Sequence, residues 1–117
     1  MSKRTEKVSE LMKRQLSEII FREIDFPRNV LVTLTRVKVS DDLSSANIYM
    51  GTLPEKESQK ILKILNFKIY SIQKEIDKRL RMRPIPKIRF LEEKETKKAA
   101  IIEQVLEKIQ KENKGDD

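Results

Sequence analysis

The spacing of apolar residues changes along this chain, and the order of those changes is the strongest constraint on its fold. From Thr5 to Ile24 they recur every three or four positions, as in an amphipathic helix that Pro27 should stop. Val30 to Val39 is rich in Val, Leu and Thr, and Ser45 to Met50 alternates apolar with polar residues, so both are expected to be strands. The turn-forming residues Ser40 to Ser44 separate them, which predicts an antiparallel hairpin.

The first of these strands carries one irregularity. Its alternation changes phase near Thr35 and Arg36, so that Leu34 and Val37 fall on opposite faces of a regular strand. Either a β-bulge or burial on both faces would account for the change, and the sequence leaves both open.

Helical spacing returns in the second half of the chain. Pro54 opens a helix whose pattern shifts at Asn66-Phe67-Lys68 and resumes to Leu80, which indicates two helices or one kinked helix. Pro84 and Pro86 end helical structure, and a third strand is expected from Lys87 to Leu91.

Beyond the third strand, the sequence predicts a solvated acidic loop and then a last helix capped by Thr96. The acidic residues of that loop are Glu92, Glu93 and Glu95. The order of elements favours an α+β fold in which helices cover a three-stranded sheet. We expect one domain over residues 1–110 and a flexible polar tail over residues 111–117.

Positive charge is concentrated in one segment. Residues 68–90 carry eight basic and two acidic side chains, a net +6 of the chain's +7. Lys74 and Lys78 share a helix face, whereas Lys87 and Arg89 point away from the apolar side of their strand. Such a concentration predicts a polyanionic partner, and charge alone leaves RNA, DNA and anionic membrane open. The eight cations are Lys68, Lys74, Lys78, Arg79, Arg81, Arg83, Lys87 and Arg89.

Residue usage argues against an enzyme. The chain has no Cys and no His, so thiolate metal sites and the commonest general base are absent. Asp41-Asp42 is expected to stabilise a turn rather than bind a metal, and no carboxylate dyad or glycine-rich phosphate loop is present. We therefore expect no catalytic residue, cofactor, metal or small-molecule substrate. No apolar run has the length of a membrane span and the N-terminus lacks a signal-peptide core, so a cytoplasmic location and no membrane partner are expected.

Aromatic residues are few, and only Tyr49 is expected to be exposed on a strand. Sheets that read single-stranded RNA normally carry stacking aromatics on neighbouring strands. This scarcity favours contacts to phosphate and ribose on folded RNA.

Several motifs follow one another along the chain: Arg4 and Val8, Pro27-Arg28, the run from Leu34 to Leu43, Ala46-Asn47-Ile48-Tyr49, and the run from Arg81 to Phe90. Their order and spacing resemble the ribosome-binding factor A family, whose fold is a type II KH-like domain, and the resemblance covers about Arg4 to Phe90. The family's interhelical kink has Ala-x-Gly in place of the GxxG loop of an ordinary KH domain, and the aligned residues here are Lys68-Ile69-Tyr70.

The resemblance implies a non-enzymatic, bacterial factor that binds the free 30S subunit and 16S rRNA during late maturation. It also implies support of rRNA 5′-end processing, often important in the cold. Arg4 joins the eight cations as an expected RNA-binding residue, and a monomer is the default. Three alternatives stay open: a KH-type nucleic-acid-binding or ribosomal protein, a protein-interaction domain, and a metal-dependent nuclease.

Overall fold

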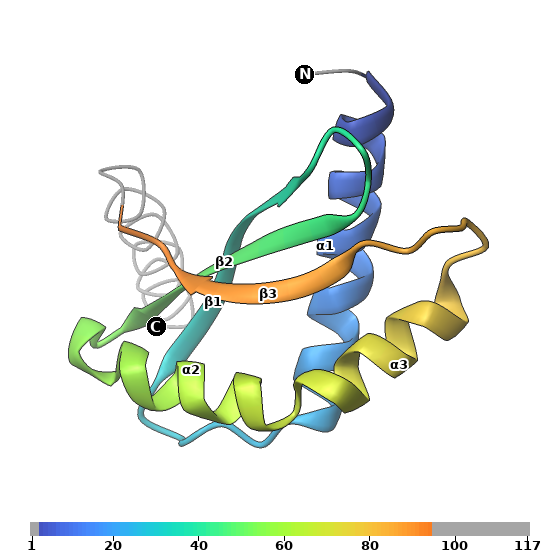
Figure 1. Cartoon of the computed structure of the whole chain (residues 1–117). Coiled ribbons are helices and arrows are strands. Elements are labelled where there is room, and N and C mark those ends of the chain that lie inside the picture. The colour runs from blue at the N-terminus through green and yellow to red at the C-terminus, as the bar shows by residue number, and fades with distance from the viewer. Residues whose placement is uncertain (1–2, 95–117) are drawn as a thin grey trace, which may run out of the picture.

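The computed structural model describes residues 3–94 of the chain. Three helices and three strands follow one another in the order expected from the sequence, with one short 3-10 turn (Figure 1). The helix expected after Thr96 and the polar tail lie outside the described residues. The elements are α1 (Lys3–Glu23), β1 (Leu31–Val39), β2 (Ser45–Leu53), η1 (Glu55–Glu57), α2 (Ser58–Phe67), α3 (Ile69–Arg79) and β3 (Lys87–Glu92).

The element boundaries differ from the expected ones in physically understandable ways. α1 begins at Lys3, before the expected start at Thr5, and Thr5 is buried. Pro54 precedes the 3-10 turn η1, and α2 begins only at Ser58. The pattern shift at Asn66-Phe67-Lys68 is a true helix boundary: Lys68, with φ −98° and ψ 6°, separates α2 from α3. The expected interhelical kink therefore forms without Ala or Gly.

The sheet is mixed, in the order β1-β2-β3. β1 and β2 pair antiparallel as the predicted hairpin, whereas β3 pairs parallel to β2. A parallel neighbour requires a crossover connection, and α2 and α3 supply it. The register of β1 shifts between Leu34 and Arg36, so the phase change in the sequence is a β-bulge at Thr35. The bulge returns Leu34 and Val37 to the same face of the sheet.

All three helices pack on one face of the sheet around a single core. Side chains of β1, β2 and β3 that share this face join the buried stripes of the helices in one apolar cluster. α1 packs against β1 and α3, α2 packs against β3 and β2, and α3 packs against β3 (Figure 1). The fully buried members include Met12, Leu16, Ile19, Ile20, Ile48, Met50, Ile61, Leu65, Ile72 and Ile76.

Glu93 is buried, and the expectation of a solvated acidic loop was wrong for this residue. Its carboxylate accepts hydrogen bonds from Thr35 Oγ1 at 3.1 Å and from Arg36 Nε at 2.8 Å, so both bulge residues point at it. The Arg36 guanidinium also lies 4.0 Å from the ring centroid of Tyr49. The preceding Glu92 closes β3 and accepts a hydrogen bond from Ser58 at the start of α2. A charge is retained in the interior here because the bulge supplies donors for it.

Replacing Glu93 tests this arrangement. Glu93→Ala should lower the free energy of unfolding by about 2–3 kcal/mol, because the buried Thr35 hydroxyl and the Arg36 guanidinium lose a charged acceptor. Urea denaturation at neutral pH measures the change. Lys94→Ala is the control, since Lys94 is exposed and adjacent in sequence. Equal midpoints for the two variants would contradict the role given to Glu93.

The turn between β1 and β2 is held by its own serines. Leu43 takes a positive φ of 60°, an unusual conformation for a residue with a branched side chain, and buries that side chain in the core. Asp42 Oδ1 accepts hydrogen bonds from the Ser44 hydroxyl at 2.7 Å, the Ser40 hydroxyl at 2.7 Å and the Ser44 amide at 3.0 Å. These donors, the Ser44 hydroxyl first, lower the pKa of Asp42 from 3.8 to about 2.

A depressed carboxyl pKa gives this turn a defined pH dependence. The stabilisation from Asp42 is complete above its ordinary pKa of 3.8 and is lost as the pH falls through the folded-state value of about 2. Asp42→Asn should therefore flatten the loss of stability in that acid window, as followed by thermal unfolding at successive pH values. Asp41→Asn removes the same charge from the same turn and should leave the wild-type slope unchanged.

Candidate nucleic-acid interface

α3 presents one apolar and one basic face. Ile72 and Ile76, one helical turn apart, are completely buried, so the opposite side of the helix points outward. Lys74 and Lys78 are four residues apart and both are exposed, as the sequence predicts. The helix therefore carries two neighbouring cations on its solvent side.

The segment between α3 and β3 carries two further cations. Leu80, the C-cap residue, has an extended backbone with ψ 137°, and the chain bends at Arg83 and Pro84 before it reaches β3. Leu80 and Pro86 are buried at the two ends of the segment, whereas Arg81 and Arg83 between them are exposed. Apolar and basic residues alternate from Leu80 to Arg83, and both arginines point to solvent.

Gln73 fixes the far end of this segment to α3. Its side-chain Nε2 donates to the Pro86 carbonyl oxygen at 3.2 Å, and its Oε1 accepts from the Ile88 amide at 2.8 Å. β3 is an edge strand, so these groups have no further strand to pair with. The amide side chain completes the edge and sets where the arginine-bearing segment lies.

These elements bring four of the predicted residues together. A shallow hollow on the surface is lined by Lys74, Lys78, Arg81 and Arg83, together with Asp77 and Leu80. Asp77 is its one acidic lining residue, and that carboxylate accepts a hydrogen bond from Gln73. Such an open, strongly basic hollow suits a phosphate backbone better than an enclosed small molecule. We call these four cations the α3-exit cluster.

Lys87 and Arg89 lie on a second hollow, at the edge of the sheet. Both are exposed on β3 and line this hollow with Ser44 and Ser45 of the hairpin. Arg89 pairs in register with Asn47, on the sheet face opposite the helices. The two cations therefore extend the basic surface from the segment after α3 onto the sheet.

Arg79 has a different role from its neighbours. Its Nη1 donates to Gln15 Oε1 at 3.1 Å and to Glu18 Oε2 at 3.0 Å, and both acceptors belong to α1. Glu75, one turn earlier in α3, lies 3.6 Å from its Nε. This guanidinium ties α3 to α1, so we leave Arg79 out of the proposed RNA surface.

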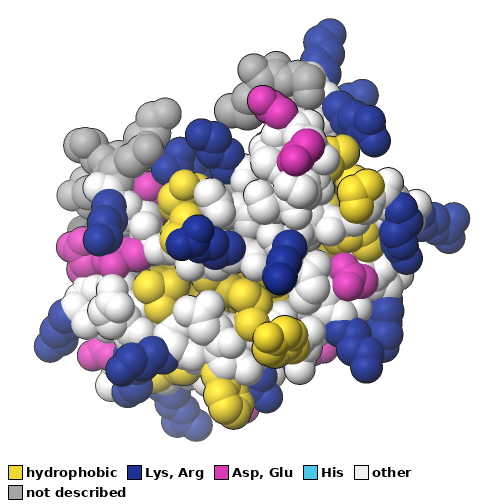
Figure 2. All heavy atoms as spheres, in the orientation of Figure 1, with side chains coloured by type: hydrophobic (Ala, Val, Ile, Leu, Met, Phe, Trp, Pro, Cys, Tyr) yellow, Lys and Arg dark blue, Asp and Glu magenta, His cyan; other side chains and the backbone are white. Residues whose placement is uncertain are grey.

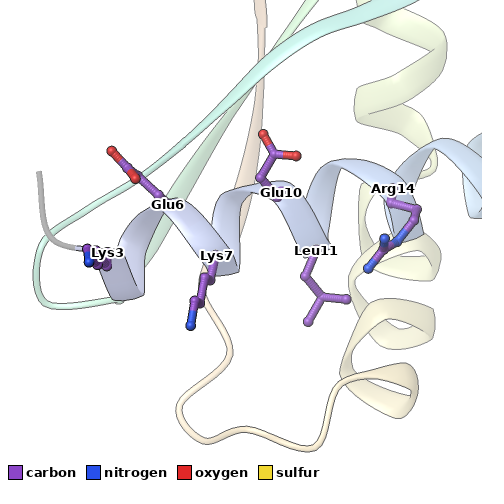
Figure 3. A pocket seen from close by; sticks show the side chains of 6 residues that line it. All are labelled: Lys3, Glu6, Lys7, Glu10, Leu11 and Arg14. Atoms are coloured by element: carbon purple, nitrogen blue, oxygen red, sulfur yellow. The ribbon is translucent and has the colours of Figure 1, made fainter.

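The two remaining predicted residues lie apart from the α3-exit cluster. Lys68 is exposed at the boundary between α2 and α3. Arg4 is exposed near the start of α1, where a separate hollow lies (Figure 3). In that hollow Lys7, Leu11 and Arg14 project from one side of the helix while two glutamates project from the other, so its charge is mixed.

Three further exposed lysines, on α2 and on β1, were not among the predicted residues. Lys60 and Lys63 lie on α2, and their spacing of three residues was a readable signal that they share a face. Lys38 is exposed on β1 and pairs with Asn47, in one cross-strand row with Arg89. Only the strand register reveals that row.

The described residues 3–94 contain no group of three or more His, Cys, Asp or Glu that could hold a metal ion. Within the same range, no helix combines the length and the apolar character that a membrane span requires.

Lys78 and Arg79 are adjacent in sequence, and we expect one to bind RNA and the other to stabilise the fold. Arg79→Ala should lower the free energy of unfolding by about 1 kcal/mol, because it removes a partly exposed ion pair to Glu18, and it should leave RNA affinity unchanged. Lys78→Ala should weaken RNA binding at low salt and leave stability unchanged, since Lys78 is exposed. Filter binding and thermal unfolding measure both variants. Loss of RNA affinity in Arg79→Ala together with loss of stability in Lys78→Ala would contradict these two roles.

Known proteins resemble this chain over nearly all of its length. The family model for ribosome-binding factor A matches residues 4–106. The factor of Thermodesulfovibrio yellowstonii is 36% identical over 93% of this chain and 92% of its own length. That of Geobacter metallireducens is 36% identical over the full length of both chains.

Solved structures agree with this relationship. The solution structure of the Thermotoga maritima protein described as a putative ribosome binding factor A superposes with a TM-score of 0.68 and 28% identity, over 80% of this chain and 91% of that one. The crystal structure of the Thermus thermophilus factor superposes with a TM-score of 0.64 and 28% identity, over 75% of this chain and 93% of that one. The sequence, the order of elements and the fold lead to one conclusion: this chain belongs to the ribosome-binding factor A family.

Proposed function

We propose that this chain is a cytoplasmic, monomeric assembly factor that binds the free 30S ribosomal subunit through 16S rRNA during late maturation and supports rRNA 5′-end processing. A homology model of the Thermus thermophilus relative, 29% identical to this chain, has been fitted into a cryo-electron microscopy map of its 30S complex. Membership of the same family supports the same partner for this chain.

The observation that carries the proposal is the α3-exit cluster. Lys74, Lys78, Arg81 and Arg83 converge on one hollow, and Lys87 and Arg89 prolong the basic surface onto β3. Several cations on one open surface bind several phosphates at once, and release of their counterions drives association. The two arginines can each hold a phosphate with two parallel hydrogen bonds, whereas the lysines act as point charges.

The proposal assigns this surface to binding and not to catalysis. Contacts with phosphate position a protein on RNA but carry no sequence information by themselves. The shape of the immature subunit would therefore supply the specificity, and the spacing of the cations along α3 and the segment after it would have to match that shape.

Sedimentation of cell extracts over a sucrose gradient tests the cellular role. An assembly factor should travel with free 30S subunits and be nearly absent from 70S ribosomes and polysomes. Immunodetection of the chain in each fraction gives the distribution. Equal stoichiometry across translating ribosomes would instead identify a ribosomal protein and refute the proposed role.

Neutralising the α3-exit cluster tests the surface. The variant with Lys74, Lys78, Arg81 and Arg83 all changed to Gln should bind purified 30S subunits more weakly. The slope of the logarithm of the binding constant against the logarithm of salt concentration should become shallower by roughly three to four, about one for each lost phosphate contact. A variant with Lys3, Lys7, Arg14 and Arg22 of α1 changed to Gln removes the same four charges from exposed positions and controls for total charge. An unchanged salt slope in the cluster variant would move the binding surface elsewhere.

A further inference from the structure

The boundary between α2 and α3 exposes two aromatic side chains. Phe67 is 84% exposed and Tyr70 is 86% exposed, more than any other large hydrophobic residue that the structure describes. Phe21, the next in order at 54%, packs edge-on against Phe26, with ring centroids 6.2 Å apart. Neither Phe67 nor Tyr70 makes an aromatic or cation–π contact with another described residue. Both rings therefore present free faces to solvent.

The kink places these rings in the middle of a basic ridge. Lys63 precedes Phe67 by four residues on α2, and Lys74 follows Tyr70 by four residues on α3, so each ring has a lysine one helical turn away. Lys68 lies between the two rings in sequence and is also exposed. Figure 2 shows apolar side chains at the surface where α2 meets α3, with Lys and Arg side chains around them.

The charge of this ridge has one sign. From Gln59 to Lys78, every fully exposed charged residue is a lysine. The acidic residues of that stretch, Glu75 and Asp77, are half-buried and point their carboxylates at Arg79 and Gln73 respectively. The five lysines are Lys60, Lys63, Lys68, Lys74 and Lys78.

We propose that Phe67 and Tyr70 form a stacking platform for unpaired bases of a single-stranded RNA segment, whose phosphates lie on the flanking lysines. This inference rests on the proposed function in so far as both place RNA on the α2–α3 side of the molecule. It adds a second mode of contact, because stacking requires bases that are free of a duplex, whereas the α3-exit cluster needs only phosphates.

RNA fits this platform better than an apolar protein surface. The centre of a protein interface is normally depleted of charged residues, lysine among them, whereas exposed lysines flank both rings. Here the rings are surrounded by lysines and no exposed carboxylate lies among them, which complements a chain that alternates apolar base faces with anionic phosphates.

The test uses the full chain and two labelled probes of about ten nucleotides. One is single-stranded RNA of mixed sequence without self-pairing, and the other has the same backbone with abasic riboses in its centre. Phe67→Ala with Tyr70→Ala should raise the Kd for the first probe on the order of tenfold to a hundredfold, given the usual strength of base–aromatic stacking. The Kd for the abasic probe and the salt slope should stay unchanged.

Two controls separate stacking from damage to the fold. Asn66→Ala with Ser71→Ala alters exposed polar neighbours of the rings and should bind both probes like the wild type. Because both rings are exposed, the aromatic double variant should keep the wild-type thermal midpoint. The chain has two Tyr and no Trp, so in Tyr49→Phe the fluorescence reports Tyr70 alone and should be quenched by the probe that carries bases.

The inference is overturned by either of two results: equal loss of affinity for both probes, or wild-type affinity for both. It also fails if the double variant binds RNA normally yet loses 30S subunits or anionic phosphatidylglycerol vesicles, since the rings would then dock on protein or lipid. The stacking inference and the proposed function can fail independently. A wild-type chain that ignores 30S subunits but passes both probe tests would refute the function and keep the platform.

Discussion

Burial of Ile72, Ile76 and Leu80 against the sheet fixes the rotation of α3 about its axis, and the exposed chemistry depends on that rotation. With this stripe inside, Lys74 and Lys78 can only point outward. The same burial anchors the start of the segment that carries the arginines, while Gln73 and Pro86 hold its end. The basic surface is thus rigidly presented by apolar packing, so little conformational entropy is lost when it meets a polyanion.

Local patterns were sufficient for most of the fold. The helical period of α1, the hairpin turn and the Pro84-Ile85-Pro86 stop are all signals within a few residues, and the elements formed where they indicated. The charge concentration after Lys68 was likewise readable without a structure, and four of its members do share one hollow. The phase change at Thr35 announced an irregularity, although only the strand register identified it as a bulge.

The parts that the sequence could not predict all depend on partners distant in the chain. Arg79 looks like its basic neighbours until α1 places Gln15 and Glu18 against it. Glu93 looks solvated until the β1 bulge brings donors to its carboxylate, 57 and 58 residues away in sequence. The exposure of Phe67 is of the same kind, because whether an aromatic on a helix faces the core or solvent depends on how that helix docks. The sequence pattern pointed to strand aromatics, and Phe67 is exposed on a helix.

The central claim is that the α3-exit cluster faces rRNA in the complex with the small subunit. Cryo-electron microscopy of this chain bound to immature 30S particles tests it most directly, because the density reports which surface is covered. The account predicts phosphate oxygens within hydrogen-bonding distance of Lys74, Lys78, Arg81 and Arg83. A complex in which this surface faces solvent and another side of the molecule contacts the particle would contradict it.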